Sequence, residues 1–472
     1  MKPTFGFLIT SILVLTSCSP SPTQLEKIKQ RGELIVLSRY GPTTLHENDG
    51  QFSGLEYDLA KQFSERLGVK LKLIIPDNLG NILDEIEHNK ADIAAAGLTI
   101  TPKREKKIRF GPVYQEVSQQ LVYRQGNNKP KNLASLENKL LEVVADSSHV
   151  DQLIRHQSDI PELKWIASKL LDSKNLLELV QLEMIDYTIA DSNEITVNQN
   201  LFPELRVAFN VSDPQPLAWA MSLSEDSSLY DEVILFFEDI TVTGKLDRLM
   251  EKYYGHIRRF DYVDTRAIYR KLLTQLPKYQ LFFEQAGVNF NIDWRLLAAI
   301  SYQESHWDPK AISNTGVKGL MMITNVTAKQ MKIKNRRDPE QSINAGAGYL
   351  SLLRKRLPER IQEPDRTWMA LAAYNIGFGH LEDARILTKQ NGKNPDHWPD
   401  VKKSLPLLSK KKWYSQTRHG YARGNEPVNY IKNIRRYYDI ILYVNQDNTT
   451  DKTQYQEGEV KGSTQQEPPP AL

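Results

Sequence analysis

The chain has 472 residues, of which 40% are hydrophobic and 25% charged, so it can bury ordinary cores and is not a wholly disordered protein. A chain of this length holds about two or three domains. Its 61 Lys and Arg residues against 58 Asp and Glu leave a net charge of +3, too small to indicate a protein that coats nucleic acid. The single cysteine, Cys18, excludes an intrachain disulfide and a cysteine-based metal cluster.

Residues 1–17 are typical of a signal peptide. A basic start precedes an apolar run over residues 5–15, which is too short to span a bilayer as a helix. The run leads into Leu15-Thr16-Ser17-Cys18, which resembles the bacterial lipobox, where the cysteine is lipidated and becomes the mature N-terminus. Ser19 follows, and the resemblance then implies an anchor in the outer membrane. An ordinary cleaved signal with an unrelated cysteine is the alternative, and no later segment predicts a transmembrane helix.

After a short tether at 18–24, residues 25–255 alternate between strand and helix patterns. Such alternation indicates parallel sheets packed by helices, and its return after residue 140 predicts two lobes that close near residues 254–255. Strands are expected at residues 34–37, 71–75, 92–96, 142–145 and 187–190, and helices at residues 57–67, 79–88 and 176–182.

The character of the chain changes after a basic and aromatic linker at 256–267, which we expect to be packed. Apolar residues over 268–445 follow helical spacing, which predicts a second, α-rich domain. The polar tail at 446–472 contains Pro468-Pro469-Pro470 near its end, and we expect it to be disordered. The predicted architecture is therefore multidomain, with a bilobal α/β domain followed by an α-rich domain.

One glutamate of the α-rich domain lies on an apolar helix face. Asp293 is a good N-cap for a helix over residues 294–306, on which Leu297, Ile300 and Glu304 are spaced by three and four residues. A carboxyl held against an apolar wall loses the solvation of its charged form, so its pKa rises and it can act as an acid near neutral pH. A glutamate paired with a basic residue, without a catalytic role, is the alternative.

Three ordered motifs around this glutamate resemble the lysozyme-like lytic transglycosylases. The first, within 303–322, contains Glu304-Ser305, Pro309-Lys310-Ala311-Ile312-Ser313 and Gly316-Val317-Lys318-Gly319-Leu320-Met321. The second is Ala372-Ala373-Tyr374-Asn375-Ile376-Gly377, and the third, a looser match, is Glu426-Pro427-Val428-Asn429-Tyr430-Ile431. The pair Met321-Met322, with the runs at 405–408 and 421–424, resembles the membrane-bound lytic murein transglycosylase F branch. The resemblance implies a lysozyme-like fold and peptidoglycan as the substrate.

The resemblance further implies that Glu304 alone performs the chemistry, without a cofactor or a metal. It would protonate the glycosidic oxygen between N-acetylmuramic acid and N-acetylglucosamine, while the substrate's own N-acetyl oxygen stabilises C1. It would then accept the proton of the muramyl 6-hydroxyl, whose attack on C1 closes a 1,6-anhydro ring. Two-carboxylate glycosidases need a second Asp or Glu, and the family does not use Asp308 in that way. A lysozyme-type hydrolase with water as the nucleophile is an alternative.

Five residues would bind the substrate according to the same resemblance, namely Ser313, Met321, Tyr374, Asn375 and Tyr430. Ser313 would orient the glutamate or the N-acetyl group, Tyr374 and Asn375 would line the cleft, and Tyr430 would lie near the catalytic carboxyl. A turn or N-cap role for Ser313 and core roles for Met321 and Tyr374 are the alternatives. Gly316 and Gly319 are expected to allow a tight turn.

Residues 25–255 resemble the periplasmic amino-acid-binding proteins of solute-binding family 3. The resemblance is carried by Gly97-Leu98-Thr99-Ile100-Thr101-Pro102-Lys103-Arg104, Phe110-Gly111-Pro112-Val113-Tyr114, Thr243-Gly244-Lys245-Leu246 and Tyr253-Tyr254-Gly255. It implies that Arg104 holds a ligand α-carboxylate through its planar guanidinium, with a further contact from Thr99. It also implies that Asp191 holds the ligand ammonium and that the loop at Ser147 and Ser148 presents backbone donors.

A solute-binding fold joined to an enzyme can instead lose its ligand and remain as a scaffold. In that case Arg104 would simply pair with Glu105 or Asp77. If the ligand is retained, an amino acid or a cell-wall stem peptide would close the lobes and alter the attached enzyme.

The leading hypothesis is an outer-membrane-anchored lytic transglycosylase with a regulatory N-terminal domain. A solute receptor that docks on peptidoglycan without cleaving it is the main alternative. The histidines show no pair with the spacing of a zinc-binding helix, so we expect no metal. No nucleic-acid partner is expected.

Overall fold

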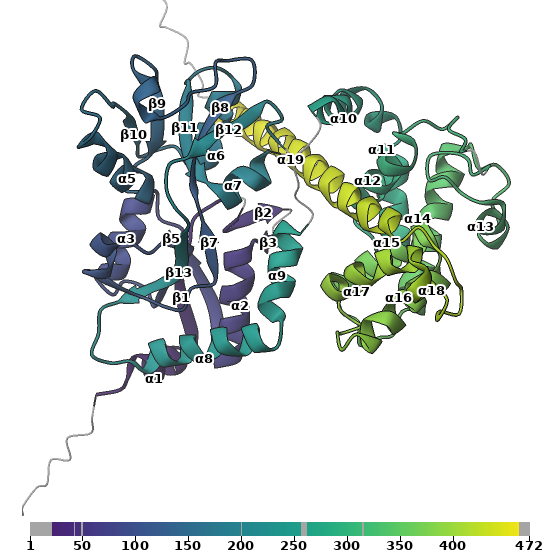
Figure 1. The fold of residues 1–472 in the computed structure, drawn as a ribbon, viewed down its shortest axis with the longest axis horizontal. Coiled ribbons are helices and arrows are strands. Elements are labelled where there is room, and N and C mark those ends of the chain that lie inside the picture. The colour runs from purple at the N-terminus through teal and green to yellow at the C-terminus, as the bar shows by residue number, and fades with distance from the viewer. Residues whose placement is uncertain are drawn as a thin grey trace, which may run out of the picture.

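The computed structural model describes residues 21–41, 43–48, 51–199, 201–255, 262–313 and 316–461, with side chains in the last helix described up to residue 445. The expected signal peptide and Cys18 lie outside the described residues. The described chain forms an α/β part followed by a helical part, which confirms the expected fold class (Figure 1). No helix in the described ranges is both long and apolar enough to cross a membrane.

The first lobe is built on a mixed sheet in the order β4-β1-β5-β13-β6, with β7 also paired to β13. The parallel strands β1, β4 and β5 follow the expected rhythm, and α2 ends at Gly68, whose left-handed backbone stops the helix as expected. Its strands are β1 (Glu33–Leu37), β4 (Lys70–Ile74), β5 (Ile93–Thr99), β6 (Ile108–Phe110), β7 (Gln115–Val117) and β13 (Gln215–Ser222), with the small hairpin β2 (His46–Asn48) and β3 (Gln51–Ser53). Its helices are α1 (Gln24–Arg31), α2 (Leu55–Leu67), α3 (Leu79–Glu87), α4 (Pro102–Glu105), α8 (Ser228–Val242) and α9 (Lys245–Tyr254).

The second lobe carries a five-stranded sheet in the order β10-β9-β11-β8-β12. Its strands are β8 (Gln119–Arg124), β9 (Leu141–Val144), β10 (Ile166–Ser168), β11 (Tyr187–Asp191) and β12 (Leu205–Asn210), and its helices are α5 (Ser148–Gln157), α6 (Ser173–Gln181) and α7 (Ser192–Asn198). Both sheets contain the expected parallel pairs, but β8, β12 and β13 pair antiparallel with their neighbours, which the sequence did not predict. These strands carry the chain between the lobes, and antiparallel pairing needs no helical crossover.

The helical part surrounds α12, whose Leu297 and Ile300 are fully buried in one continuous core. Its elements are α10 (Tyr262–Thr274), α11 (Gln280–Phe290), α12 (Trp294–Ser305), α13 (Asn325–Gln330), α14 (Pro339–Arg356), α15 (Asp365–Ile376), α16 (Phe378–Gln390), α17 (Trp398–Ser404), α18 (Lys411–Tyr414) and α19 (Asn425–Lys461). Part of the expected linker, residues 262–267, already belongs to α10, whereas 256–261 lie outside the description.

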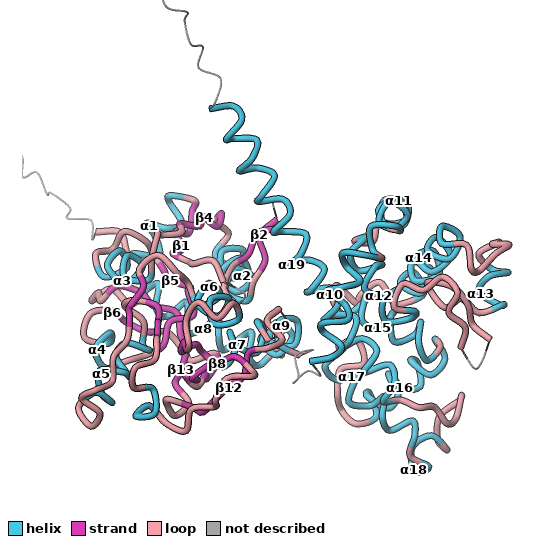
Figure 2. Tube along the Cα trace, turned by 90° about the horizontal axis from the view of Figure 1, so that it is seen from above, coloured by secondary structure: helices cyan, strands magenta, loops and turns pink. Residues whose placement is uncertain are grey.

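Helix α19 joins the two parts of the molecule. Figures 1 and 2 show it leaving the helical part and running alongside the α/β part. It continues to Lys461, whereas the sequence predicted a disordered tail from residue 446. A helix that is already packed extends at low cost because each added residue gains a hydrogen bond. The one proline of α19, Pro427, lies in the first turn, where proline is tolerated, and no other proline precedes residue 468.

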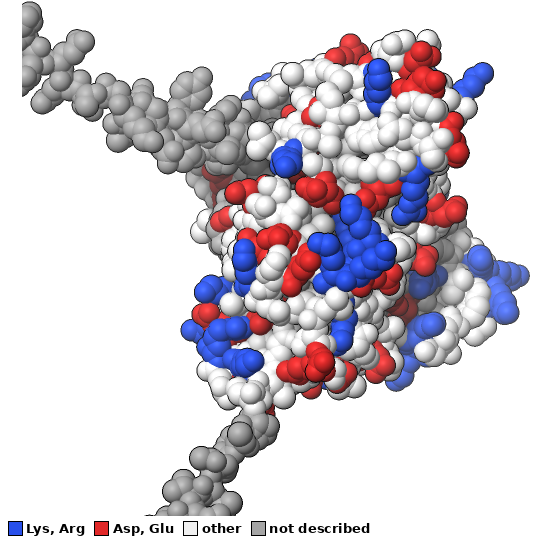
Figure 3. Space-filling model, turned by 90° about the vertical axis from the view of Figure 1, so that its left-hand side faces the viewer, with Lys and Arg blue, Asp and Glu red and all other residues white. Residues whose placement is uncertain are grey.

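The face of the α/β part in Figure 3 shows Lys and Arg side chains interspersed with Asp and Glu. This mixture agrees with the small net charge of +3.

Candidate active site and inter-lobe cleft

Helix α12 presents Glu304 in its last turn. Asp293 caps the helix as expected, accepting a hydrogen bond from the backbone N–H of Arg295. Tyr438 of α19 also donates to Asp293 over 2.7 Å. The helix stops at His306, whose left-handed backbone has a φ of 50°. The carboxyl of Glu304 therefore lies beside a fixed helix end.

Glu304 is half-buried, and its carboxylate oxygen Oε1 accepts a hydrogen bond from Tyr430 Oη at 2.5 Å. Burial raises the pKa of Glu304 to about 7, although the hydrogen bond from Tyr430 opposes the shift. Within the described residues Glu304 forms no ion pair, so the alternative of a glutamate paired with a basic residue is not what the structure shows. A carboxyl with this pKa exchanges a proton readily near neutral pH.

Tyr374 of α15 lies close enough to Glu304 to feel its charge. Its hydroxyl donates to the carbonyl of Met321 over 2.9 Å, and its ring lies 5.5 Å from that of Tyr349. Burial and the negative charge of Glu304 hold the pKa of Tyr374 well above its usual value, so the phenol stays a neutral donor. Burial and Glu304 raise the pKa of Tyr430 in the same way.

The loop after α12 is fixed by hydroxyl groups. Ser301 and Ser305 both donate to the carbonyl of Leu320, and Ser342 of α14 accepts from the N–H of Met321. Gly319 has a φ of 85°, and a Cβ there would lie 1.8 Å from the carbonyl oxygen of Arg336. The tight turn expected at Gly316 and Gly319 is therefore confirmed, and only glycine fits at the second position.

The remaining predicted binding residues differ in their placement. The side chain of Met321 is fully buried against Gly346, so the expectation that it lines the cleft was wrong, and it contributes its carbonyl to Tyr374 instead. Ser313 accepts a hydrogen bond from the N–H of Val317 within a turn. Asn375 is exposed at the end of α15.

Sequence reasoning missed the serines that hold this loop. Ser301 and Ser305 are four residues apart on α12, so both hydroxyls face the same side of the helix. That spacing was visible in the sequence, but their shared acceptor, Leu320, was not. Tyr349 of α14, which packs on Tyr374, was missed as well.

A second candidate site lies between the two lobes. A cavity of about 30 Å³ is lined by residues of both: Arg39, Leu79, Gly97, Leu98, Thr99, Arg104, Val144, Ser147, Ser148, His149, Ser173, Asp191 and Glu194. It thus brings together the four residues predicted for ligand binding, namely Thr99, Arg104, Ser147 and Asp191. The cavity is small in this arrangement of the lobes.

Arg104 is buried and spans the gap between the lobes. Its guanidinium donates to the carbonyl of Thr99 at 2.9 Å and, across the cleft, to the carbonyl of Asp146 at 3.1 Å. It forms no ion pair with Glu105 or Asp77 among the described residues, so that alternative is wrong. Its donors are occupied by neutral carbonyls, which a carboxylate could displace.

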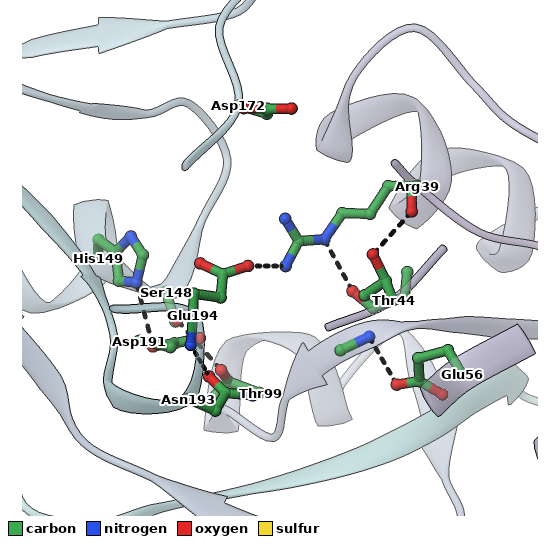
Figure 4. Close-up of polar contacts among 12 residues, drawn as sticks. Arg39, Thr44, Glu56, Thr99, Ser148, His149, Asp172, Asp191, Asn193 and Glu194 are labelled. Atoms are coloured by element: carbon green, nitrogen blue, oxygen red, sulfur yellow. Dashed lines mark hydrogen bonds and ion pairs between the residues drawn. The ribbon is translucent and has the colours of Figure 1, made fainter. Parts of the chain in front are cut away.

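An ion pair that the sequence did not reveal also crosses the cleft. Arg39, which follows β1 in the first lobe, reaches Glu194 of α7 in the second lobe at 2.7 Å (Figure 4). His149 Nε2 lies 3.2 Å from a carboxylate oxygen of Asp191, within hydrogen-bond distance. The Nδ1 atom of His149 is buried and has no partner in the described part of the chain. The Arg39–Glu194 ion pair therefore joins the two lobes across the cleft.

No group of three or more His, Cys, Asp or Glu side chains in the described part of the chain is arranged to hold a metal ion.

Comparisons with known proteins match both parts of the chain. Residues 33–256 match the family model of bacterial extracellular solute-binding proteins, family 3, and residues 282–397 match the transglycosylase SLT domain. A membrane-bound lytic murein transglycosylase F of Saccharophagus degradans is 49% identical over 89% of this chain and 84% of its own length. A membrane-bound lytic murein transglycosylase F 1 of Alkalilimnicola ehrlichii is 47% identical over 96% of this chain and 91% of its own length.

We predict that Tyr430→Phe raises the pKa of Glu304 above about 7. The hydroxyl stabilises the charged carboxylate, and a hydrogen bond to a charged group contributes about 1.5 kcal/mol, roughly one pKa unit. Carbon-13 NMR titration of the glutamate carboxyls measures this pKa. Tyr421→Phe, which removes an exposed hydroxyl that is not among the groups acting on Glu304, is the control and should leave it unchanged. An unchanged Glu304 pKa in Tyr430→Phe contradicts this account of the site.

We predict that Gly319→Ala destabilises the helical part by at least about 3 kcal/mol, because the new methyl group meets the Arg336 carbonyl. Gly316→Ala is the matched control, since Gly316 also has a positive φ but no neighbour within 4 Å, and should cost only about 1 kcal/mol. Chemical denaturation of both variants gives the comparison. Equal losses of stability would show that the close approach at Gly319 is unimportant.

Proposed function

The chain belongs to the membrane-bound lytic murein transglycosylase F family, and from this premise we propose that Glu304 is its single acid–base catalyst. The protein is a lytic murein transglycosylase with a solute-binding family 3 domain at its N-terminal side. The observation that carries the proposal is the half-buried carboxyl of Glu304, with a pKa raised to about 7 and a tyrosine hydroxyl at 2.5 Å.

The first step is general acid catalysis. Protonated Glu304 donates to the glycosidic oxygen between N-acetylmuramic acid and N-acetylglucosamine, and the bond from that oxygen to C1 of the muramyl residue breaks. The carbonyl oxygen of the muramyl N-acetyl group bonds to C1 and forms an oxazolinium-like intermediate. The proton thus leaves Glu304 with the departing sugar, and Glu304 becomes a carboxylate.

The second step returns the proton. The Glu304 carboxylate accepts the proton of the muramyl 6-hydroxyl, whose oxygen attacks C1 and displaces the N-acetyl oxygen. The product is a 1,6-anhydro ring, and Glu304 is again an acid. A pKa near 7 suits both steps, because neither protonation state is strongly disfavoured at neutral pH.

The neighbouring groups support these two steps. Tyr430 donates to the carboxylate that forms after the first step and stabilises it. Tyr374 donates to the Met321 carbonyl and so holds the loop that follows α12. Ser313 lies in the loop after α12, and the exposed Asn375 follows Tyr374 at the end of α15; both are proposed to contact the sugar.

We predict that Glu304→Gln abolishes cleavage of murein without unfolding the protein, because glutamine can neither donate nor accept the proton. Mass spectrometry of digested murein is the measurement, and wild type should release anhydromuropeptides. The control Asp308→Asn removes the nearby exposed carboxylate and should remain active. Reducing ends in the wild-type digest would indicate a hydrolase, and turnover by Glu304→Gln near the wild-type rate contradicts the mechanism.

The inter-lobe cleft is proposed to bind an amino acid or a cell-wall stem peptide and to regulate the enzyme. Arg104 would exchange its carbonyl partners for the ligand carboxylate, and Asp191 would hold the ammonium, with Thr99 and the loop at Ser147 adding contacts. The unpartnered Nδ1 of His149 offers a further polar contact at the same cavity. Ligand entry would part the Arg39–Glu194 pair, because this ion pair joins the two lobes across the cleft.

We predict that stem peptide or a free amino acid raises the melting temperature of wild type and that Arg104→Ala removes this shift. The variant Lys106→Ala, on the exposed end of the same short helix, should keep it. Differential scanning fluorimetry with each ligand provides the measurement. If none of these ligands shifts wild type, the cleft does not bind this class of molecule.

Anchoring in the outer membrane through a lipid on Cys18 is proposed from the lipobox resemblance. The membrane-bound name of the relatives supports attachment to a membrane. A tether on Cys18 would keep the enzyme beside its insoluble substrate without relying on charge.

A further inference from the structure

Helix α19 holds both ends of the catalytic helix. Tyr430 donates to Glu304 at the C-terminal end of α12, and Tyr438 donates to the N-cap Asp293 at the other end. Buried side chains between them, Ile431 and Ile434, pack in the core that surrounds α12. The position of α19 therefore sets the distance between the Tyr430 hydroxyl and the catalytic carboxyl.

Arg435 lies between these two tyrosines but points to the α/β part. Its guanidinium donates to the carbonyls of Glu251 at 2.7 Å and Lys252 at 2.6 Å, and it lies 3.3 Å from the Glu251 carboxylate. Both carbonyls belong to the last turn of α9, where the helix dipole is negative, and the Glu251 carbonyl also accepts from the N–H of Gly255. Arg435 thus caps a helix of the other domain.

The guanidinium of Arg435 depends on this contact. The side chain is 3% exposed and lies over the ring of Trp368 at 4.8 Å. A buried cation is costly unless it is paired, and Glu251 with two carbonyls supplies the pairing. If α9 moved away, Arg435 would have to turn toward solvent or α19 would have to shift with it.

Helix α9 is in turn fixed to the first lobe. Lys252 and Tyr253 both bind Asp58 of α2, at 2.6 and 2.7 Å. The first turn of α2 carries Glu56, which accepts from the N–H of Gly97 at the inter-lobe cavity. The contact between α9 and Arg435 therefore depends on the position of the first lobe, which forms one side of the inter-lobe cleft.

We propose that Arg435 is a positioning residue for the transglycosylase reaction, which holds α19 so that Tyr430 meets Glu304 only when the Arg435 guanidinium is seated on the Glu251 and Lys252 carbonyls of α9. The proposal rests on Glu304 as the acid, but not on any ligand of the cleft. In this proposal the proton affinity of Glu304 depends on the contact between Arg435 and the α/β part. About one and a half turns of α19, from Arg435 to Tyr430, connect that contact to the carboxyl.

The groups that face these residues come from several elements. Glu304 is faced by Tyr430 of α19 and Tyr374 of α15. Arg435 is faced by Glu251 of α9 and Asp439 of its own helix, and Glu251 also binds Lys402 of α17 at 2.5 Å. Lys402 thus makes an ion pair with the same carboxylate without touching α19, and it provides a matched control.

The test compares Arg435→Met with Lys402→Met in the full-length protein. Each variant removes one cation from Glu251, but only the first loosens α19. We expect the decline of kcat/KM on soluble peptidoglycan to occur about half a pH unit higher in Arg435→Met than in wild type. Tyr430→Phe should shift the profile in the same direction, because in both variants the Glu304 carboxylate loses hydrogen bonding and its pKa rises. Lys402→Met should keep the wild-type profile.

A double variant separates positioning from general damage. If Arg435 acts through Tyr430, Arg435→Met should cause no further shift of the profile in the Tyr430→Phe background. Glu251→Gln leaves every residue of α19 unchanged and should shift the wild-type profile in the same direction. This variant replaces Arg435→Met in the test if Arg435→Met does not fold. A wild-type profile in both Arg435→Met and Glu251→Gln, or an equal shift in Lys402→Met, overturns the proposal. The proposed function would still hold after such a result, provided that Glu304→Gln is inactive.

Discussion

The structure depends on one costly interaction, the removal of the Glu304 carboxyl from water. Burial raises its pKa to about 7, and the hydroxyl of Tyr430 at 2.5 Å keeps the charged form accessible. That balance requires an apolar wall, a fixed helix end and a donor from a distant segment. Helix α12 with its Asp293 cap provides the first two, and α19 provides the third.

The same helix that donates to Glu304 also meets the solute-binding family 3 domain. Arg435 of α19 is buried against the end of α9, while Tyr443, further along, packs on Phe202 of the second lobe with ring centroids 6.3 Å apart. One helix therefore contacts Glu304 and both lobes. Buried ion pairs contribute little net stability but specify a geometry, which suits a joint that must be either formed or broken.

Local sequence patterns predicted what local physics determines. The Asp293 cap, the end of α2 at Gly68 and the turn at Gly319 each follow from the preference of one residue type for one backbone geometry. Motif resemblance supplied Glu304, Tyr374 and Tyr430, which the structure brings together. The apolar pattern could not distinguish a cleft-lining Met321 from a buried one, since both require an apolar side chain.

Contacts between distant residues escaped the sequence. Arg39 and Glu194 are 155 positions apart, and Arg435 and Glu251 are 184 apart, so no spacing rule connects them. The antiparallel strands β8, β12 and β13 were missed for a related reason, because their partners are set by how the chain crosses between the lobes. Long-range pairing of this kind is decided by topology rather than by local preference.

The central claim is that one desolvated carboxyl performs both proton transfers and that water takes no part in the bond exchange. Burial and the hydrogen bond from Tyr430 set the pKa of Glu304, and no other carboxylate contributes to it. Digestion of murein in water enriched in oxygen-18 tests this claim most directly. The account predicts that the new muramyl ends contain no oxygen-18 and are lighter than hydrolytic ends by one water. Incorporation of oxygen-18 at C1 during cleavage would contradict it.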